Sequence, residues 1–580
     1  MGSSAATIVI DGKVIVAIEE ERLSRLKNDG GFPYKSIEYC LKATNLKIKD
    51  IDKVAVYWQP WRIHNRTIKV LINMLKDPKN LLNSFNRGIE AIFGGADKFH
   101  KYPELRGSWI ELFYLKKILK KYFGNFNSKV EYFDHHKCHA ASIYHISDFE
   151  NTICLTYDGG GESDSTVIFS IENQKFYQLK SISWPNSLGH FYSAFTGFLG
   201  FRMLEGEYKM MGLSPYGRPR FKKIILDNIL IKDTNGGYFF NTKILNYHSA
   251  LKGEFSVSLN NLIGKPRMPD SEFTEYHKDV AASVQAAYEE ILIHILKWAR
   301  NQKPNIKNLC IAGGCGLNVS ANGKILLNKI FEKVMIPPAP HDAGCSIGAA
   351  FLSEKLQNPK SILSMTTPYL GKNYSDNEII SSFEKKNLPI PKKYDEKNLI
   401  SKVVSVLCDG GVVAWFQGGS EFGPRALGNR SFLADPRFDE IREVLNQKIK
   451  KRELFRPFAP SCKEEVKQIF FNIGQKSPYM NIVAEVLKEK RSSIPAITHI
   501  DNTARVHTVD KKINPLYWKL IDHFESKTGV GVLLNTSFNI QEPIVESPDH
   551  AIDCFLRSSV DCLAIGSYIC DFDWRSRANL

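Results

Sequence analysis

Residues 152–162 read TICLTYDGGGE, and residues 308–318 read NLCIAGGCGLN. Each stretch begins as a short apolar run typical of a buried strand and leads directly into a cluster of glycines. Glycines at such a turn let backbone amides approach a phosphate closely, because no side chain stands where the ligand must lie. Two such strand-and-glycine turns predict a duplicated nucleotide-binding architecture in which both turns face one cleft.

Strand patterns alternate with helical stretches around these two turns, and this alternation predicts the α/β class. A hairpin is predicted near the N-terminus, since ATIVI (6–10) and KVIVAI (13–18) flank the turn-forming pair Asp11 and Gly12. Further strands are predicted at 53–58 (KVAVYW), 130–133 (VEYF), 166–171 (TVIFSI), 411–416 (GVVAWF) and 529–535 (GVGVLLN).

Two helices are predicted from apolar periodicity. Apolar residues recur at helical spacing over 279–300, so we expect one long packed helix there, with Trp298 in the core. The run 109–123 has an apolar stripe opposite a lysine-rich face. A helix lying on a membrane surface would show this pattern, but the pattern is also common in ordinary globular domains, which we favour.

The length predicts more than one domain, because 580 residues exceed the roughly 250–300 that one hydrophobic core supports. The stretch 356–376 is rich in Pro, Ser, Thr and Asn and has no helical or strand periodicity. The predicted organisation is a first domain at 1–360, a linker at 361–375 and a second α/β domain at 376–580.

The charge and the cysteines limit the function classes. A net charge of +15 could serve nucleic acid, anionic lipid or phosphorylated small molecules. The eleven cysteines show no CxxC zinc spacing, which favours a reduced, cytoplasmic setting. No apolar run reaches 18 residues and no signal-peptide pattern opens the chain, so membrane spanning and secretion are disfavoured.

A cluster of potential metal ligands begins at DHHKCH, residues 134–139. In a helix, His135 and His139 stand one turn apart on the same face, where two imidazoles can hold one cation. Histidines at this spacing also occur as ordinary core or surface residues, so the spacing allows coordination without requiring it. His136 is expected to pack or to form hydrogen bonds.

Two aspartates favour the metal interpretation. Asp158 ends the strand 152–158, and Asp342 lies in the loop of IPPAPHDAGCSIGAA (336–350). Each can add carboxylate oxygen to the two imidazoles, and such a set suits Fe(II), Mn(II) or Zn(II). An aspartate in a glycine turn can instead cap its own backbone, and this alternative stays open for Asp158.

A second cluster is basic and suits an anion. It comprises FGPRALGNRS (422–431) and KIKKRELFRPF (448–458). Arg425 stands between two glycines that permit a tight loop, which would bring its guanidinium into bidentate contact with a phosphate or carboxyl group. A basic run can also be a solvated face. The apolar residues around Arg456 favour a buried functional arginine.

The segment LLNTSFN (533–539) ends a strand with the small polar side chains of Asn535 and Ser537. Strand ends of this kind are where α/β sheets usually present ligands. A metal-type and a phosphate-type cluster in one chain together predict an enzyme that uses an activated phosphorylated donor.

These motifs, in this order, resemble the O-carbamoyltransferases of nodulation and of aminoglycoside or cephamycin antibiotic pathways. The resemblance extends over nearly the whole chain and includes 187–201 (SLGHFYSAFTGFLGF), 205–217 (EGEYKMMGLSPYG), 313–325 (GGCGLNVSANGKI) and 503–509 (TARVHTV). It implies an N-terminal domain of the actin and Hsp70 nucleotide-binding (ASKHA) fold, similar to the tRNA threonylcarbamoylation protein Kae1. It also implies a C-terminal α/β domain similar to YrdC.

The resemblance also implies roles for particular residues. The expected ligands of an iron-type divalent metal are His135, His139, Asp158 and Asp342. The residues expected to orient the nucleotide phosphate are Gly159, Gly160, Gly161, Gly313, Gly314 and Asn318. The residues expected to hold the carbamoyl and phosphate groups are Arg425, Lys450, Arg456, Arg505, Asn535 and Ser537. Those expected to be catalytic are His135, His139, Asp158, Arg425 and Lys450.

The implied activity is ATP-dependent O-carbamoyl transfer. The YrdC-like domain would form carbamoyladenylate from carbamoyl phosphate and ATP with Mg²⁺, and the Kae1-like domain would transfer the carbamoyl group at its metal site. The expected acceptor is a hydroxyl of a small molecule such as a natural product, antibiotic, sugar or alkaloid. No nucleic-acid partner is expected, and a homodimer is left open.

Two alternatives come from other function classes. A tRNA threonylcarbamoylation-type enzyme would explain the +15 charge, because phosphate contacts need Lys and Arg. A non-catalytic nucleotide-binding protein is the other. Members of the resembled family open with a strand and a polar turn, often with a histidine, ahead of the segment equivalent to SSAATIVIDGK (3–13). A first strand and a candidate general base are therefore expected to be missing here.

Overall fold

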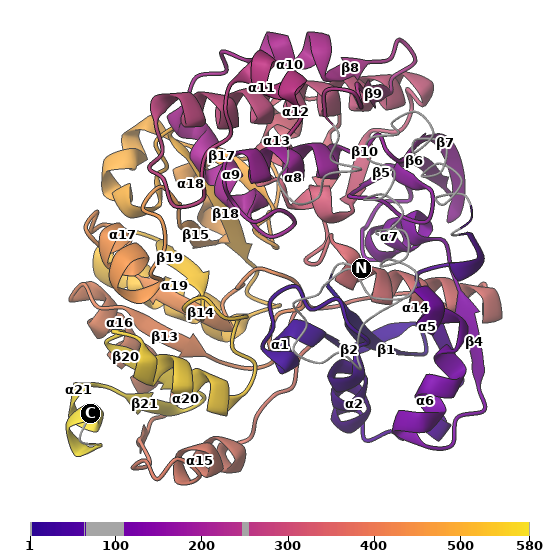
Figure 1. Ribbon diagram of the computed structural model, residues 1–580. Coiled ribbons are helices and arrows are strands. Elements are labelled where there is room, and N and C mark those ends of the chain that lie inside the picture. The colour runs from indigo at the N-terminus through magenta and orange to yellow at the C-terminus, as the bar shows by residue number, and fades with distance from the viewer. Residues whose placement is uncertain (1–2, 63, 65–108, 246–254, 579–580) are drawn as a thin grey trace. The chain divides into compact units, whose positions relative to one another are not determined.

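The computed structural model describes residues 3–62, 64, 109–245 and 255–578 (Figure 1). The chain divides into two compact units. Unit 1 comprises Met1–Glu20 and Asn28–Met365, and unit 2 comprises Glu21–Lys27 and Thr366–Leu580. Both units are mixed α/β, as the sequence predicts. The short segment Glu21–Lys27 belongs to unit 2 through contacts with residues about 400 or more positions away, which no local pattern reveals.

Unit 1 is built around a five-stranded sheet in the order β11-β10-β5-β6-β7. The strands of unit 1 as a whole are β1 (Ala5–Ile10), β2 (Lys13–Glu19), β3 (Lys53–Val56), β4 (Lys129–Tyr132), β5 (Asn151–Tyr157), β6 (Asp164–Glu172), β7 (Lys175–Ser183), β8 (Leu230–Lys232), β9 (Tyr238–Phe240), β10 (Asn308–Ala312) and β11 (Lys333–Met335). Its helices are α2 (Tyr34–Ala43), α5 (Trp109–Phe113), α6 (Leu115–Phe123), α7 (His135–Tyr144), α8 (Leu188–Phe198), α9 (Glu207–Leu213), α10 (Lys222–Asn228), α11 (Val257–Ile263), α12 (Glu275–Gln302), α13 (Val319–Leu327) and α14 (Cys345–Gln357).

The two strand-and-glycine turns lie at the same edge of this sheet. Strands β5 and β10 are parallel neighbours, so the turns that follow them emerge side by side. Gly313 has a φ of +94°, and a Cβ placed there would lie 2.1 Å from the carbonyl oxygen of Tyr157. Only glycine allows the second turn to pack this closely against the end of β5.

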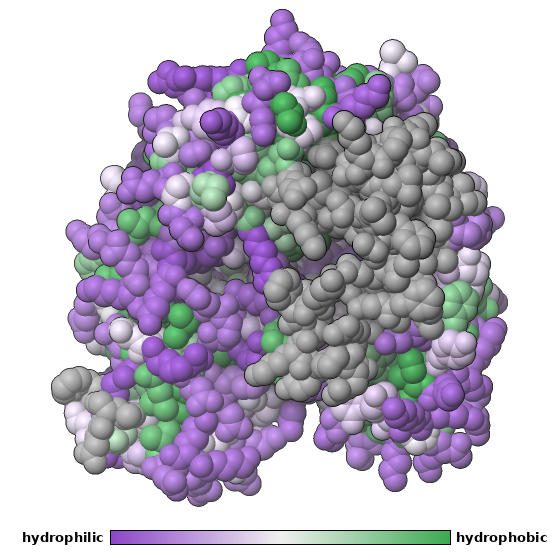
Figure 2. Space-filling view, in the orientation of Figure 1, coloured by the Kyte–Doolittle hydropathy of each residue, from purple (hydrophilic) through white to green (hydrophobic). Residues whose placement is uncertain are grey.

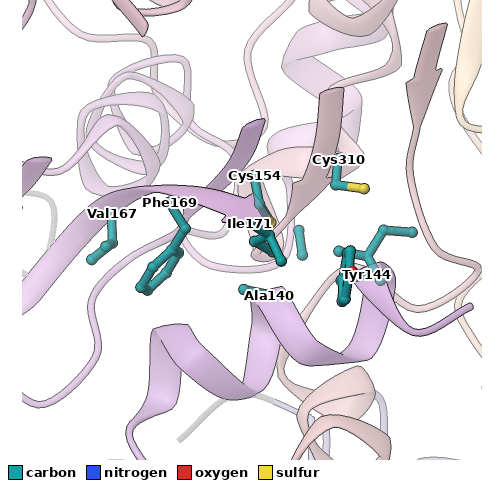
Figure 3. Packing of buried hydrophobic residues seen from close by; sticks show 9 residues of the cluster. Ala140, Tyr144, Cys154, Val167, Phe169, Ile171 and Cys310 are labelled. Carbon is teal, nitrogen blue, oxygen red and sulfur yellow. The ribbon is translucent and has the colours of Figure 1, made fainter. Parts of the chain in front are cut away.

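Helix α7 is fixed to the sheet by a buried apolar cluster (Figure 3). Ala140 and Tyr144 of α7 pack against Cys154 of β5, Phe169 of β6 and Cys310 of β10. On another side α7 packs against α14, where Cys138 and Ala141 meet Cys345 and Ala349. The small residues at this contact let the two helices approach closely, because Gly348 has no Cβ to strike the backbone of Cys138.

Most elements predicted from periodicity are present. The N-terminal hairpin turns at Asp11 and Gly12, which have φ values of 49° and 78°. The predicted 279–300 helix is α12, extended by a few residues at each end, and Trp298 is half-buried against the turn at Gly236. The run 109–123 is broken at Tyr114 into α5 and α6. Strand β7 was not predicted.

The amphipathic run packs inside unit 1. Leu115 and Leu119 of α6 are buried in a cluster with Leu41 and Phe126, which supports the globular interpretation of this run. In the described parts of the chain, no helix is both long and apolar enough to cross a bilayer. Outside the atoms drawn in grey, the face shown in Figure 2 is mostly hydrophilic, with small separate apolar patches.

Unit 2 is built on a ten-stranded mixed sheet in the order β12-β21-β20-β13-β14-β19-β15-β18-β17-β16. Its strands are β12 (Lys392–Lys393), β13 (Val413–Phe416), β14 (Arg430–Ala434), β15 (Ala459–Lys463), β16 (Phe471–Asn472), β17 (Ile482–Val486), β18 (Thr503–Val509), β19 (Val532–Ser537), β20 (Cys562–Ile565) and β21 (Tyr568–Cys570). Its helices are α15 (Asp376–Glu384), α16 (Glu396–Cys408), α17 (Ile441–Glu443), α18 (Lys467–Phe470), α19 (Pro515–Thr528), α20 (Pro548–Arg557) and α21 (Phe572–Arg577), and α1 (Glu20–Ser24) begins where the chain enters this unit.

The centre of the sheet forms the core of unit 2. Strands β13, β14, β15 and β20 are buried along their whole length, and helices α16 and α19 pack against them. Helix α19 starts with a proline after its N-cap Asn514 and ends at Gly529 in a left-handed conformation, the usual signals for each end. The basic loops of the sequence connect these central strands.

Candidate metal centre and arginine cluster

Helix α7 presents the two histidines from a firmly anchored first turn. The Asp134 side chain caps the helix by accepting the backbone N–H of Lys137 at 2.9 Å. The Glu162 carboxylate accepts the backbone N–H of His135 at 3.3 Å, so a second carboxylate lies at the positive end of the helix. The Trp58 ring packs against the His135 ring with centroids 4.6 Å apart.

Four side chains from three segments converge beside this helix. The Asp158 Oδ2 atom lies 2.8 Å from His135 Nε2 and 3.1 Å from His139 Nε2. The Asp342 Oδ1 atom lies 4.0 Å and 3.8 Å from the same two nitrogens. One ligand atom from each of the four residues lies within 4.8 Å of the others. The structure therefore brings together the four residues that the sequence analysis grouped.

The charges at this centre are opposite and shift one another. Burial alone would lower the pKa of His135, but the neighbouring Asp158 raises it to about 9. Burial would raise the pKa of Asp158, yet the imidazole of His135 holds it well below its usual range. The Asp158 carboxylate thus contacts the histidines, and the alternative in which it caps its own backbone is not seen.

The donor set fits a divalent transition metal. Ligand atoms held about 2.1 Å from one ion lie roughly 3–4 Å from each other, and the measured separations from 2.8 to 4.0 Å match. The other carboxylate oxygen of Asp158 is buried and has no hydrogen-bond partner among the described residues. Both observations are those of a ligand set built to close on a cation.

Sequence reasoning missed several residues that shape this centre. Glu162 and Trp58 act through His135, as described above. Cys345 is buried at the start of α14, and its sulfur lies within 4.8 Å of a ring nitrogen of each histidine. The i+3 spacing of Cys345 from Asp342 was the available signal. His136 hydrogen-bonds to Thr156 at 3.0 Å and to the Asp164 carbonyl oxygen at 2.9 Å, as expected.

The predicted phosphate-orienting residues differ in their surroundings. Gly159, Gly160, Gly161 and Gly314 line the turns next to the metal-type ligands, and a Cβ at Gly161 would lie 3.0 Å from the His135 ring. Asn318 instead has both ends of its amide engaged by Gln285, at 3.0 and 3.1 Å, and its oxygen also caps α13. Asn318 therefore links α13 to α12, and its predicted role toward the nucleotide stays a prediction.

In unit 2, four arginines gather from three segments. Gly423 and Gly428 have φ values of 117° and 99°, which gives the tight loop predicted around Arg425. Burial lowers the pKa of Arg425 to about 10, and nearby Arg456 contributes. Burial lowers the pKa of Arg505 well below its usual range, followed by the like charges of Arg425, Arg452 and Arg456.

The arginine cluster comprises Arg425, Arg452, Arg456 and Arg505, whose like charges act on one another. The Nε–H groups of Arg425 and Arg505 are buried, and no residue in the described ranges accepts them. One carboxylate oxygen of Glu453 lies 3.9 Å from Arg456. Mutually repelling guanidiniums with unpaired N–H groups are the arrangement expected of an anion-binding site.

Lys450 has a different environment from the one predicted. Its side chain is buried, and its Nζ donates to the Asn539 carbonyl and side-chain oxygens, both at 2.8 Å, and to the Ser537 carbonyl oxygen. Burial holds its pKa well below the usual range. An ammonium has three protons to donate, so these protein oxygens can take all of them. In this structure Lys450 binds the end of β19, and its predicted role in holding the carbamoyl and phosphate groups stays a prediction.

The segment Glu21–Lys27 forms hydrogen bonds to two loops of unit 2. Arg22 is fully buried and donates to the Gly423 carbonyl oxygen at 2.5 Å, two residues before Arg425. Arg25 donates to the carbonyl oxygens of Pro543 and Ile544 at 2.5 and 2.8 Å. These contacts position the loop that carries Arg425.

Comparison with known proteins identifies the family. Residues 2–351 match the family model for the carbamoyltransferase N-terminus, and residues 404–571 match the model for the carbamoyltransferase C-terminus. The two matches together span most of the chain and describe a group-transfer enzyme. The chain belongs to the carbamoyltransferase family, as the sequence motifs indicated.

Named relatives agree with this assignment. Over 98% of its length the chain is 36% identical to nodulation protein NolNO of Sinorhizobium fredii, covering 79% of that protein. It is 37% identical to an uncharacterized protein of Synechocystis sp., covering 98% of this chain and 94% of that one. A crystal structure of HypF from T. kodakarensis has a TM-score of 0.24 at 13% identity and covers 46% of this chain and 40% of that one. At that score the actin-like and YrdC-like assignments stay predictions.

Proposed function

We propose that this carbamoyltransferase works in two steps, with carbamoyladenylate formed in unit 2 and its carbamoyl group transferred to a small-molecule hydroxyl in unit 1. The observation that carries this division is that the anion-type and metal-type clusters fall in different compact units. Unit 2 holds the four arginines, and unit 1 holds the His–His–Asp–Asp set.

In the first step, carbamoyl phosphate loses inorganic phosphate by hydrolysis and leaves carbamate. A carbamate oxygen then attacks the α-phosphorus of ATP, and pyrophosphate departs with its electron pair. Arg425, Arg456 and Arg505 would offset the negative charge that builds on the phosphates. The buried Nε–H groups of Arg425 and Arg505, which have no acceptor among the described residues, support this role because they need no rearrangement before an anion arrives.

In the second step, a hydroxyl oxygen of the acceptor attacks the carbamoyl carbon and its proton is lost to water, while AMP leaves as the carbon–oxygen bond to its phosphate breaks. His135, His139, Asp158 and Asp342 would hold the divalent metal, of which Fe²⁺ is the one that the motifs imply and Mn²⁺ or Zn²⁺ are alternatives. A bound divalent cation would offset the charge developing on the leaving phosphate. The glycine turns at 159–161 and 313–314 lie beside these ligands, where their backbone N–H groups could approach that phosphate.

The test combines ATP, Mg²⁺ and carbamoyl phosphate with the full chain and measures pyrophosphate and carbamoyladenylate by mass spectrometry. We expect pyrophosphate release that depends on carbamoyl phosphate. Addition of extracts rich in hydroxylated small molecules should then yield a product heavier by one carbamoyl group. Pyrophosphate release that is absent, or equal with and without carbamoyl phosphate, contradicts the proposal.

A further inference from the structure

A row of three buried polar side chains lies beside the arginine cluster. Asn535, Ser461 and His507 come from the neighbouring strands β19, β15 and β18, and they are 0%, 0% and 2% exposed. Asn535 Nδ2 lies 2.9 Å from Ser461 Oγ, which lies 2.8 Å from His507 Nδ1. Ser461 and His507 have no role in the two steps proposed above.

The hydrogen bonds fix which way the Asn535 amide points. Its Nδ2 donates to the Ala426 carbonyl oxygen at 3.2 Å as well as to Ser461 Oγ. A carbonyl oxygen can only accept, so the atom that faces Ala426 must be the nitrogen. If the amide were flipped, two oxygens would face each other across this contact. Both amide protons are therefore used, one on each partner.

The proton of Ser461 completes the row. Its oxygen accepts from Asn535, and we assign its own hydrogen to His507 Nδ1, which lies 2.8 Å away. Nδ1 can accept only in the neutral imidazole with the proton on Nε2. Burial lowers the pKa of His507 to about 3, which agrees with a neutral ring. The ring is also stacked on Tyr517, with centroids 6.3 Å apart.

This arrangement leaves one strong acceptor without a partner. The Asn535 Oδ1 atom is buried and receives no hydrogen bond from the residues that the structure describes. A buried amide oxygen left unpaired costs about 1–3 kcal/mol. The Ala426 carbonyl, Ser461 and His507 hold the amide in this orientation. Its Oδ1 atom is therefore suited to accept a hydrogen bond from an N–H group of a ligand.

The strand register places Asn535 in line with Arg505 of the arginine cluster. Ala459 of β15 pairs with Asn535, and Ser461 pairs with His507 in parallel register. Two residues back along both parallel strands, Ala459 lies abreast of Arg505. The amide and the guanidinium thus stand on the same face, separated by the small side chain of an alanine. A ligand there would meet a cation at one end and an N–H acceptor at the other.

We propose that His507, acting through Ser461, is a positioning residue that keeps Asn535 Oδ1 turned toward the donor substrate. The site thereby selects a phosphorylated donor that carries an amide N–H₂, as in a carbamoyl group, over one with a methyl in the same place. The inference rests on the proposed function and adds the physical basis of its donor selectivity. A site built to hydrogen-bond a substrate N–H rejects the analogue that lacks it, since the acceptor then stays unpaired.

The test compares carbamoyl phosphate with acetyl phosphate in ATP-dependent pyrophosphate release by the full chain. For the wild type we expect kcat/KM to favour carbamoyl phosphate by about 10²-fold or more. In His507→Leu the Ser461 hydroxyl loses its acceptor and can turn toward Asn535. The preference should fall by about tenfold, through loss of kcat/KM for carbamoyl phosphate alone.

Matched variants separate positioning from folding. In His507→Gln a side-chain oxygen can accept the Ser461 proton, so most of the preference should return. Ser461→Ala removes the middle of the row and should repeat the loss even if His507→Leu does not fold. His550→Leu removes another histidine of unit 2, at the start of α20, and should leave the preference unchanged. An equal fall in kcat/KM for both donors overturns the inference. So does an unchanged preference in both His507→Leu and Ser461→Ala.

Calorimetric binding of the two phosphates keeps this outcome distinct from failure of the proposed function. A wild type that binds carbamoyl phosphate more tightly but releases no pyrophosphate contradicts the two-step proposal and supports the selectivity. Equal binding of both compounds by the wild type contradicts the selectivity, whatever the enzyme then catalyses.

Discussion

The metal-type centre of unit 1 combines opposite charges, whereas the arginine cluster of unit 2 brings like charges together. At the metal-type centre, His135 and Asp158 neutralise each other at 2.8 Å before any ligand arrives. In the arginine cluster, burial and then like charges lower the pKa of Arg505, and the buried Nε–H groups of Arg425 and Arg505 have no acceptor among the described residues. The metal-type centre is thus stabilised by opposite charges among its own residues, whereas the like charges of the arginine cluster repel one another and a bound anion would reduce that repulsion.

Removing the shared carboxylate should have the largest effect. In Asp158→Ala, we expect carbamoyl transfer to fall on the order of 10³-fold, about 4 kcal/mol, because two histidines lose their common partner. Pyrophosphate release with carbamoyl phosphate should stay within about twofold, since we propose that this step takes place in unit 2. Measuring both products in one reaction gives the comparison. Asp148→Ala, at an exposed position, is the control, and unchanged transfer in Asp158→Ala would refute the assignment.

The buried lysine should matter next, for stability. Lys450→Met takes the donor from the Asn539 carbonyl oxygen and removes the Nζ contacts to the Asn539 side-chain oxygen and to Ser537, so it should lower the free energy of unfolding by about 3 kcal/mol. Lys448→Met, an exposed change two residues away, should cost less than about 0.5 kcal/mol. Denaturant unfolding checks both. If Lys450→Met is as stable as Lys448→Met, the tethering role is wrong.

Ligands should stabilise each cluster separately. At 100 times its Kd, Mn²⁺ or pyrophosphate should each add about 2.7 kcal/mol to the free energy of unfolding, seen as a higher Tm. We expect His139→Ala to lose the Mn²⁺ effect and keep the pyrophosphate effect, and Arg425→Gln to do the reverse. A chelator should reverse the Mn²⁺ shift in the wild type. Loss of both effects in either variant would mean that the clusters are not independent.

The smallest effect should have the opposite sign from the usual mutation. Arg505→Gln removes one of the repelling charges, so we expect the ligand-free protein to gain about 1 kcal/mol of stability while carbamoyladenylate formation falls. Arg491→Gln breaks a surface pair with Glu485 at 2.9 Å and should change stability by less than about 0.5 kcal/mol. Calorimetric melting of both variants tests this. A destabilised Arg505→Gln would show that the cluster is structural.

Much of the fold could be predicted because its signals are local. The hairpin at Asp11 and Gly12, the strands before the two glycine turns and the long helix α12 each follow from a periodicity or a turn that a short window contains. Strand β7 and the break at Tyr114 were missed, because an edge strand and a helix interruption depend on what packs against them.

The residues of the candidate sites likewise divide into those with a local sequence signal and those whose partners are distant in the chain. His135 and His139 were predictable from their spacing on one helix. The engaged amide of Asn318 and the tethered Nζ of Lys450 were not, because their partners are 33 and 87 or more positions away in the chain. The hydrogen bond from Arg22 has its partner 401 positions away, so no local sequence pattern predicts it.

The amino-acid sequence by itself determined the α/β class, the family motifs and which residue types could bind a cation or a phosphate. Only the tertiary structure decided which of those side chains retain free donors and acceptors. The physical reason is that a side chain's chemistry is a property of its type, whereas its availability depends on neighbours that strand pairing brings from distant segments. Asn535 shows both, since its amide was evident from the chain but its unpaired oxygen depends on Ala426 and Ser461.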